Sequence, residues 1–180
     1  MKYIIPIIIL SLFLFGCKAD EDDSTSNKTD AALEDTWKTA CYTDDDNNSL
    51  INTPTFAGNT LTVKDEKHSD TSCATDYRLL EESHTFAMGD AGKLTITLGS
   101  NFQRTPQSSS AVTNYNNSSK CGHSGWELNT AKTCSFGDDA GATIYCLFEI
   151  SGTTAYLECN NSAQPTSIDK TSTRNIFTKQ

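Results

Sequence analysis

The chain has 180 residues, and its 23 acidic side chains outnumber 14 Lys and Arg to give a formal net charge of −9. An acidic surface repels polyanions, so the charge argues against nucleic-acid binding and against docking on anionic lipid. Only 36% of the residues are hydrophobic. We therefore expect a polar domain with a thin core.

The first residues are ordered like an export signal. Lys2 gives a positive start, an apolar run of about twelve residues follows, and Gly16 precedes Cys17, whereas a membrane-spanning helix needs about 20 apolar residues. The segment Leu14-Phe15-Gly16-Cys17 resembles the lipobox of bacterial lipoproteins, whose cysteine is lipidated after cleavage. A plain secretory signal with a chance cysteine is the alternative.

The lipobox resemblance implies a division of the chain into three parts. Residues 1–16 would be a signal peptide, and lipidated Cys17 would join the protein to a membrane. Residues 17–32 are acidic and lack apolar periodicity, so we expect a disordered tether, followed by a domain over residues 33–180. The expected location is the bacterial cell envelope, anchored at the outer membrane, with the domain in the periplasm or at the cell surface.

Six further cysteines form an even set, which in an exported chain indicates a disulfide framework. They are Cys41, Cys73, Cys121, Cys134, Cys146 and Cys159. No Cys-x-x-Cys pair occurs, and only His123 lies near a cysteine in sequence, so we expect neither a metal site nor a cofactor.

Apolar and polar residues alternate along most of the domain, which indicates half-buried strands. The clearest segments are residues 60–67, 77–88 and 94–98, and in the second of these His84, Phe86 and Met88 share one face. Weaker strands are expected at residues 37–43, 111–115 and 126–134. Helical periodicity is not evident after residue 33, so an all-β domain is predicted.

The best-specified element is a hairpin near the C-terminus. A two-residue turn at Gly152-Thr153 pairs Ile150 with Ala155 and Cys146 with Cys159, and it places the apolar residues on one face. This register predicts the disulfide Cys146–Cys159. The pairs Cys41–Cys73 and Cys121–Cys134 follow by elimination and proximity.

Two segments resemble those of lipocalin-like proteins. Residues 33–38, with Trp37, are similar to the opening of that family, although Asp35 stands where a glycine is usual. Residues 145–157 are similar to its closing strands. The resemblance implies an eight-stranded up-and-down antiparallel barrel, which agrees with our eight or nine strands; an immunoglobulin-like sandwich is the alternative. It also implies that Trp37 closes one end of the barrel and that Arg174 is the candidate for stacking on it.

No pattern in the sequence supports an enzyme. The segment Gly122-His123-Ser124-Gly125 lacks the Gly-x-Ser-x-Gly spacing because Trp126 takes the final position. The carboxylates occur in loop-like runs, and His84 is expected to be a core histidine.

Two binding functions remain. The first is a carrier of a small apolar ligand inside the barrel, lined by Phe86, Met88, Leu94, Ile96, Phe148, Ile150 and Leu157. The second is a surface-displayed protein-interaction module, adhesin-like or inhibitor-like, with a filled barrel and polar loops at residues 44–49 and 103–120.

Overall fold

The structure, a computed structural model, describes residues 33–180. The predicted signal peptide, Cys17 and the acidic tether lie outside the described residues. Residues 33–180 hold eleven strands, one α-helix and four 3-10 turns. Eight strands form the barrel: β1 (Asp35–Thr39), β3 (Ser49–Ala57), β4 (Thr60–His68), β5 (Asp76–Met88), β6 (Lys93–Thr97), β9 (Thr143–Ser151), β10 (Thr154–Asn160) and β11 (Ile176–Lys179). The other elements are β2 (Tyr42–Thr43), β7 (Asn101–Pro106), β8 (Lys132–Ser135), α1 (Ser109–Asn117), η1 (Asp90–Gly92), η2 (Lys120–Gly122), η3 (Gly137–Asp139) and η4 (Thr173–Asn175).

The barrel is closed by β1. This strand pairs with β3, where Asp35 lies opposite Phe56, and with β11, where Trp37 lies opposite Lys179. All the strand pairs are antiparallel, and the eight barrel strands follow one another in chain order. The predicted all-β, up-and-down barrel is therefore confirmed, and the immunoglobulin-like sandwich is wrong.

The C-terminal hairpin has the predicted register. Ile150 faces Ala155, and Cys146 faces Cys159. Gly152 has a φ of +62°, which the first residue of a tight hairpin turn requires and which glycine adopts at little cost. The alternation of apolar residues along β9 and β10 is thus sufficient to predict this pairing.

The six cysteines form three disulfides in the predicted pairs. They are Cys41–Cys73, Cys121–Cys134 and Cys146–Cys159, with Cα–Cα separations of 5.8, 5.4 and 4.1 Å. The last of these lies in the barrel wall, and its Cys146 is fully buried.

The protein has two separate apolar cores. The larger one fills the barrel around Trp37, whose indole Nε1 donates a hydrogen bond to the Leu33 carbonyl at 3.0 Å. The smaller core lies outside the barrel, where Phe102 packs against Tyr115 and Trp126. Two cores of this kind divide the domain into a barrel and an attached unit.

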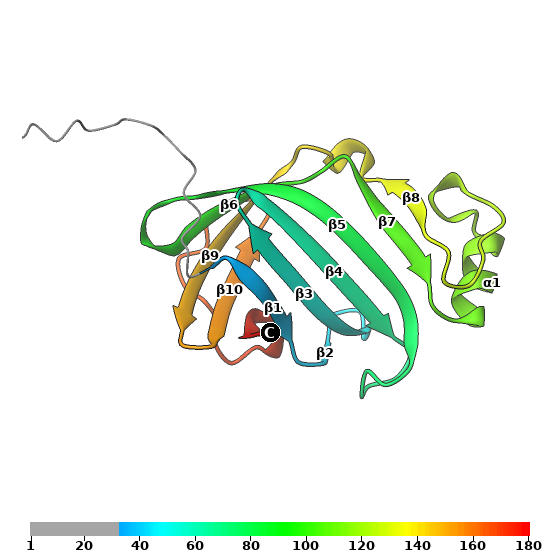
Figure 1. Cartoon of the computed structure of the whole chain (residues 1–180), viewed down its shortest axis with the longest axis horizontal. Coiled ribbons are helices and arrows are strands. Elements are labelled where there is room, and N and C mark those ends of the chain that lie inside the picture. The colour runs from blue at the N-terminus through cyan, green and yellow to red at the C-terminus, as the bar shows by residue number, and fades with distance from the viewer. Residues whose placement is uncertain (1–32) are drawn as a thin grey trace, which may run out of the picture.

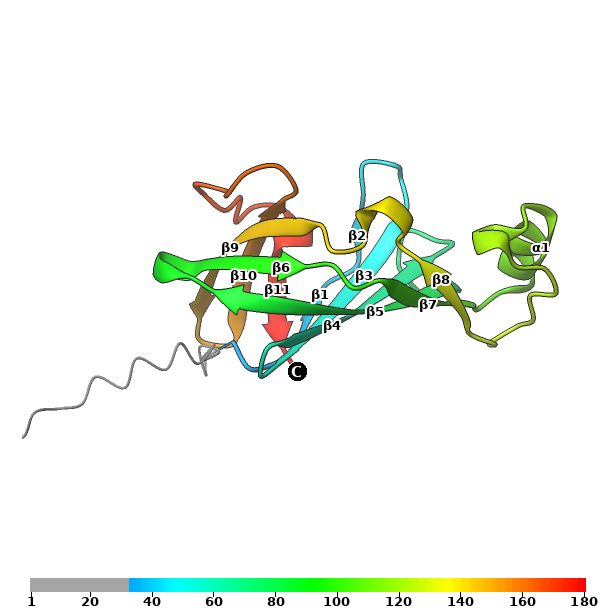
Figure 2. The same ribbon diagram turned by 90° about the horizontal axis from the view of Figure 1, so that it is seen from above.

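The attached unit, called the extension below, comprises residues 101–135 with β7, α1 and β8. It forms because β5 is longer than β6: the first half of β5 pairs with β7 and the second half with β6. Gly99 lies where the chain passes from β6 to β7. Only glycine fits at this point, since a Cβ there would lie 2.2 Å from the Ser83 carbonyl oxygen. Figures 1 and 2 show α1 and β8 at the opposite end of the molecule from the β9–β10 hairpin.

The sequence prediction was wrong at residues 111–115, which lie in helix α1 and not in a weak strand. The Ser108 hydroxyl caps the helix by accepting a hydrogen bond from the Ala111 amide at 3.1 Å, as serine does at an N-cap. Ala111 and Tyr115, four positions apart, form the buried side. With only two buried residues in nine, the helical period is too weak to detect.

Two strand assignments also need correction, and strands β3, β7 and β11 were not predicted. Cys41 lies between β1 and β2 and not within one continuous strand, and Trp126 and Leu128 lie in a loop that precedes β8. Strand β3 was not predicted, and its Pro54 is a residue that argues against a central strand. The structure accommodates Pro54 since β1 pairs with β3 only at Thr55 and Phe56.

Candidate functional site

The residues predicted to line a ligand cavity come together, but they do so as a packed core. Phe86, Leu94 and Ile96 are buried in the barrel cluster, and the phenyl rings of Phe56 and Phe86 meet edge to face with centroids 5.2 Å apart. The remaining four predicted residues, Met88, Phe148, Ile150 and Leu157, are partly buried and pack against this cluster.

The apolar cavity beside this core is very small. Its volume is about 10 Å³, and it lies between Trp37, Phe56, Phe148 and Phe177 near the start of the domain. A space of that size holds roughly one water molecule. Small-molecule sites usually have volumes of about 300–1,000 Å³, so the core as it stands has no room for an apolar ligand at this place.

The structure does not bring Trp37 and Arg174 together. Lys179 lies over the Trp37 ring, with Nζ 5.9 Å from the ring centroid, while Arg174 pairs with Asp45 at 3.4 Å. Lys179 also pairs with Asp35 at 2.8 Å, which keeps the ammonium group beside the indole. The cation at this end of the barrel is therefore Lys179, which lies opposite Trp37 in the β1–β11 register.

His84 is a core histidine with both ring nitrogens engaged. The Gly99 amide donates to Nδ1 at 3.1 Å, and Nε2 lies 3.1 Å from Glu82 Oε2. Because Nδ1 accepts the hydrogen bond from Gly99, it carries no proton. Nε2 is therefore the protonated nitrogen, and its N–H donates a hydrogen bond to the Glu82 carboxylate. These contacts tie the β6–β7 crossing to β5 and leave neither nitrogen available to a ligand.

Beyond the apolar core, the interior of the barrel becomes polar. Arg78 on β5 donates to Asp65 on β4 at 3.0 Å. Burial raises the pKa of Asp65 above its usual value, and the Arg78 guanidinium opposes that rise. Tyr42 accepts a hydrogen bond from Asn52 at 2.7 Å, and burial together with the Asp65 charge raises the pKa of its hydroxyl to about 12. This end of the interior leads towards the extension.

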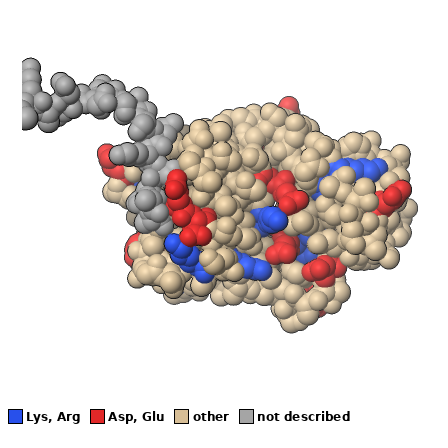
Figure 3. All heavy atoms as spheres, viewed as in Figure 1, with Lys and Arg blue, Asp and Glu red and all other residues tan. Residues whose placement is uncertain are grey.

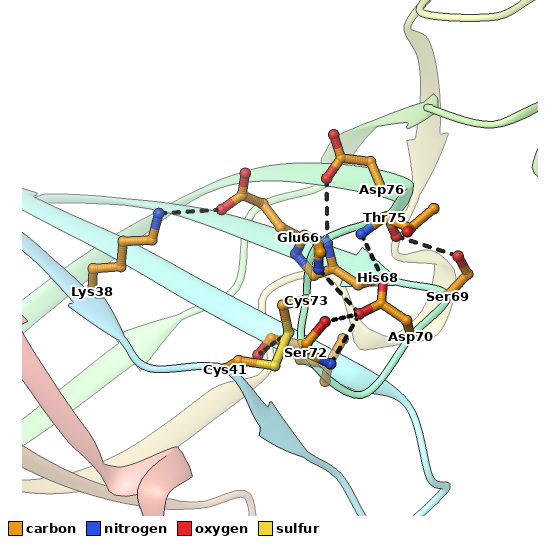
Figure 4. Close-up of polar contacts among 12 residues, drawn as sticks. Lys38, Cys41, Glu66, His68, Ser69, Asp70, Ser72, Cys73, Thr75 and Asp76 are labelled. Atoms are coloured by element: carbon orange, nitrogen blue, oxygen red, sulfur yellow. Dashed lines mark hydrogen bonds and ion pairs between the residues drawn. A yellow bond between two sulfur atoms is a disulfide. The ribbon is translucent and has the colours of Figure 1, made fainter.

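The loop between β4 and β5 is organised by Asp70 (Figure 4). Its carboxylate accepts hydrogen bonds from the amides of Ser72 and Thr75 at 2.9 and 2.6 Å. The disulfide of Cys73 fastens the same loop to Cys41. Hydrogen bonds to the carboxylate hold the pKa of Asp70 well below its usual value.

Because the folded pKa of Asp70 is depressed, its contribution to stability is present above about pH 4 and is lost as the pH falls towards the folded pKa. We expect Asp70→Ala to lower the urea midpoint of unfolding at pH 7 and to have a smaller effect at pH 2.5. Asp70→Asn, which keeps one acceptor oxygen, is the control and should have an intermediate effect at pH 7. An equal loss for Asp70→Ala at both pH values would contradict this assignment.

A polar groove lies between the barrel and the extension. It has a volume of about 420 Å³ and is lined by residues from β4, β5, β7 and α1 and from the segment that follows α1. This site, called the basic groove below, is lined by Lys67, Tyr77, Arg78, Arg104, Asn114, Tyr115, Ser118 and Lys120.

The charge of the basic groove is unusual for this protein. Four of its eight lining residues are cationic and none is acidic, although the chain as a whole carries −9. On the face drawn in Figure 3, Lys and Arg are interspersed with Asp and Glu. Such a local excess of one sign focuses the electrostatic field inside a groove.

Three of the four cations have no carboxylate partner within residues 33–180. Arg78 is paired with Asp65, whereas Lys67, Arg104 and Lys120 form no ion pair with any described residue. Arg104 donates to the Tyr115 hydroxyl at 3.2 Å, but its buried Nε has no hydrogen-bond partner in the described chain. The groove thus holds three cations that form no ion pair in the described chain, although the charge of Asp65 acts on Arg104 and that of Asp44 acts on Lys67.

Other kinds of site were sought in the described part of the chain. Within residues 33–180, no group of three or more His, Cys, Asp or Glu side chains is arranged to hold a metal ion. No described helix is long and apolar enough to span a membrane. Comparison with models of known protein families and with curated proteins finds no match to this chain.

Sequence reasoning missed the basic groove because its cations are spread over more than 50 positions. Lys67 and Arg78 become neighbours only through the β4–β5 register, and Arg104 joins them only through the β5–β7 pairing. The available signal was indirect, since the predicted polar loop at residues 103–120 contained two of the four cations.

Proposed function

We propose that the protein is a non-catalytic binding module of a bacterial envelope, attached through lipidated Cys17, which engages its partners through its surface. In this proposal the barrel is a rigid scaffold for the extension and the loops. The attachment is supported by the lipobox-like segment Leu14-Phe15-Gly16-Cys17 and not by the described structure.

The observation that carries this proposal is the packed apolar core of the barrel. The residues expected to line a ligand site pack against one another, and the apolar cavity beside them has a volume of about 10 Å³. The grooves of several hundred Å³ lie instead on the polar outside, as in the basic groove. Polar loops and grooves on a rigid scaffold are the usual carriers of binding function.

A carrier of a small apolar ligand is the second candidate. Its support is that the small cavity is lined only by apolar and aromatic side chains, including Phe148 and Leu157. Binding would require the barrel to open by moving Phe56 or Phe177. Such movement creates apolar surface that only a well-fitting ligand would cover, so a carrier would show a stable, stoichiometric complex.

Mass spectrometry of the protein purified from its own membranes tests both parts of the proposal. Under denaturing conditions, we expect a mass that includes acyl chains on Cys17, and their absence would refute the anchor. In native spectra recorded after incubation with a lipid and metabolite extract, we expect the mass of the protein without an apolar adduct. A one-to-one adduct that organic solvent releases would refute the filled barrel and favour the carrier.

A further inference from the structure

We propose that the basic groove binds an acidic sugar unit, a uronic acid or a sugar sulfate, either free or at the end of a glycan. This inference rests on the proposed function, in which the protein binds its partners through its surface and not inside the barrel. It names the class of ligand that the basic groove would bind. It is carried by the charge, the lining and the size of the groove.

The charge of the basic groove favours an acidic ligand. Lys67, Arg104 and Lys120 have no ion-pair partner among residues 33–180, and all three line the same groove. Arginine and lysine are the natural donors to carboxylate and sulfate oxygens, and arginine can bind them with two parallel hydrogen bonds. An acidic ligand would give these cations the charge-assisted hydrogen bonds that no described carboxylate makes with them.

Two of the cations, Arg104 and Lys67, are held in place before a ligand arrives. The Arg104 guanidinium carbon lies 5.5 Å from the Phe102 ring centroid and 5.4 Å from that of Tyr115. The β4–β5 register shifts next to Lys67, and such an irregularity can redirect a side chain. There the Tyr77 hydroxyl accepts a hydrogen bond from Asn114 of α1 at 3.1 Å. Helix and sheet are thus linked across the groove, which lowers the ordering cost of binding.

The polar side chains of the basic groove suit the neutral part of a sugar. The tyrosine hydroxyls, the Asn114 amide and Ser118 offer hydrogen bonds to sugar hydroxyl groups. A flat base would find no free ring to stack on: Lys67 lies over the Tyr77 ring at 5.4 Å, and the Tyr115 ring is contacted by Arg104 and Trp126.

The size of the basic groove also fits a sugar unit. A groove of about 420 Å³ falls in the range of small-molecule sites, roughly 300–1,000 Å³. That is more than a bare phosphate or sulfate ion fills. A sugar ring bearing an acidic group uses both the cations and the polar lining.

The test is isothermal titration calorimetry of the oxidised protein with a heparin-derived tetrasaccharide, which carries both uronate and sulfate, at low salt. We expect binding that weakens as salt is added and that is absent with the neutral maltotetraose. The double variant Lys67→Gln/Lys120→Gln should lose affinity by about tenfold or more. The matched control Lys64→Gln/Lys93→Gln removes the same charge outside the groove and should stay within twofold.

Three outcomes would overturn this proposal: no binding of the charged probe, equal binding of maltotetraose, or an equal loss in the two double variants. The last would mean that net charge alone attracts the probe. These outcomes leave the filled barrel untouched, because that is tested separately by the native mass spectrum. Likewise, an apolar adduct would refute the filled barrel without bearing on the groove variants.

Discussion

Replacing Trp37 with alanine is expected to lower the free energy of unfolding by about 3–5 kcal/mol, the range observed for truncating a buried tryptophan. The indole is only 1% exposed, it belongs to the apolar core of the barrel, and its Nε1 donates a hydrogen bond to the Leu33 carbonyl. Alanine would leave both a cavity and an unpaired carbonyl. The measurement is urea unfolding followed by far-ultraviolet circular dichroism.

Leu128→Ala is the matched control for this truncation. Leu128 is 49% exposed, the most exposed of the large apolar side chains in residues 33–180. Its truncation should change the free energy of unfolding by less than about 0.5 kcal/mol. A loss below about 1 kcal/mol for Trp37→Ala would show that the barrel does not depend on the core described above.

Removing the disulfide of the barrel wall has the second largest expected effect. The variant Cys146→Ala/Cys159→Ala should lose about 3 kcal/mol, since the chain-entropy model gives that value for a loop of about 15 residues and the separation here is 13. The fully buried Cys146 also loses packing. Urea unfolding under oxidising conditions measures the loss.

The disulfide of the extension offers a control of equal loop length. Cys121 and Cys134 are also 13 residues apart, but they fasten the second core and not the barrel. In Cys121→Ala/Cys134→Ala, hydrogen exchange should accelerate over residues 101–135 while β9 and β10 keep their protection. Equal acceleration in the barrel and the extension would mean that the domain unfolds as one cooperative unit.

Local patterns in the sequence were sufficient to predict a strand pairing where the alternation of apolar and polar residues alone determines the register. In the C-terminal hairpin, a shift by one residue would expose Phe148 and Leu157 together, so only one register buries them. The same register places Cys146 opposite Cys159, and the remaining cysteines then pair by elimination. Trp37, by contrast, was singled out by the resemblance of residues 33–38 to the opening of lipocalin-like proteins.

Elements that depend on single contacts were harder to predict. Helix α1 needs the cap from Ser108 and two buried residues, which is a weak signal over nine positions. Strand β3 contains Pro54, and only the short β1–β3 pairing shows that this is tolerated. In the barrel interior, the sequence supplied the correct residues, but whether they enclose a cavity depends on how closely their side chains pack.

Alternation and a small even number of cysteines determined the all-β class, the disulfide pairs and the apolar residues of the core. The barrel was implied by the resemblance to lipocalin-like proteins, and the structure separated it from a sandwich. Only the tertiary structure decided that the core residues pack beside a cavity of about 10 Å³ and that Lys67, Arg104 and Lys120 line one groove. The physical reason is that both properties depend on contacts between strands far apart in the chain. Lys67, Arg104 and Lys120 are separate charges in the sequence, and the antiparallel register of β4, β5 and β7, together with the position of α1, brings them to one site.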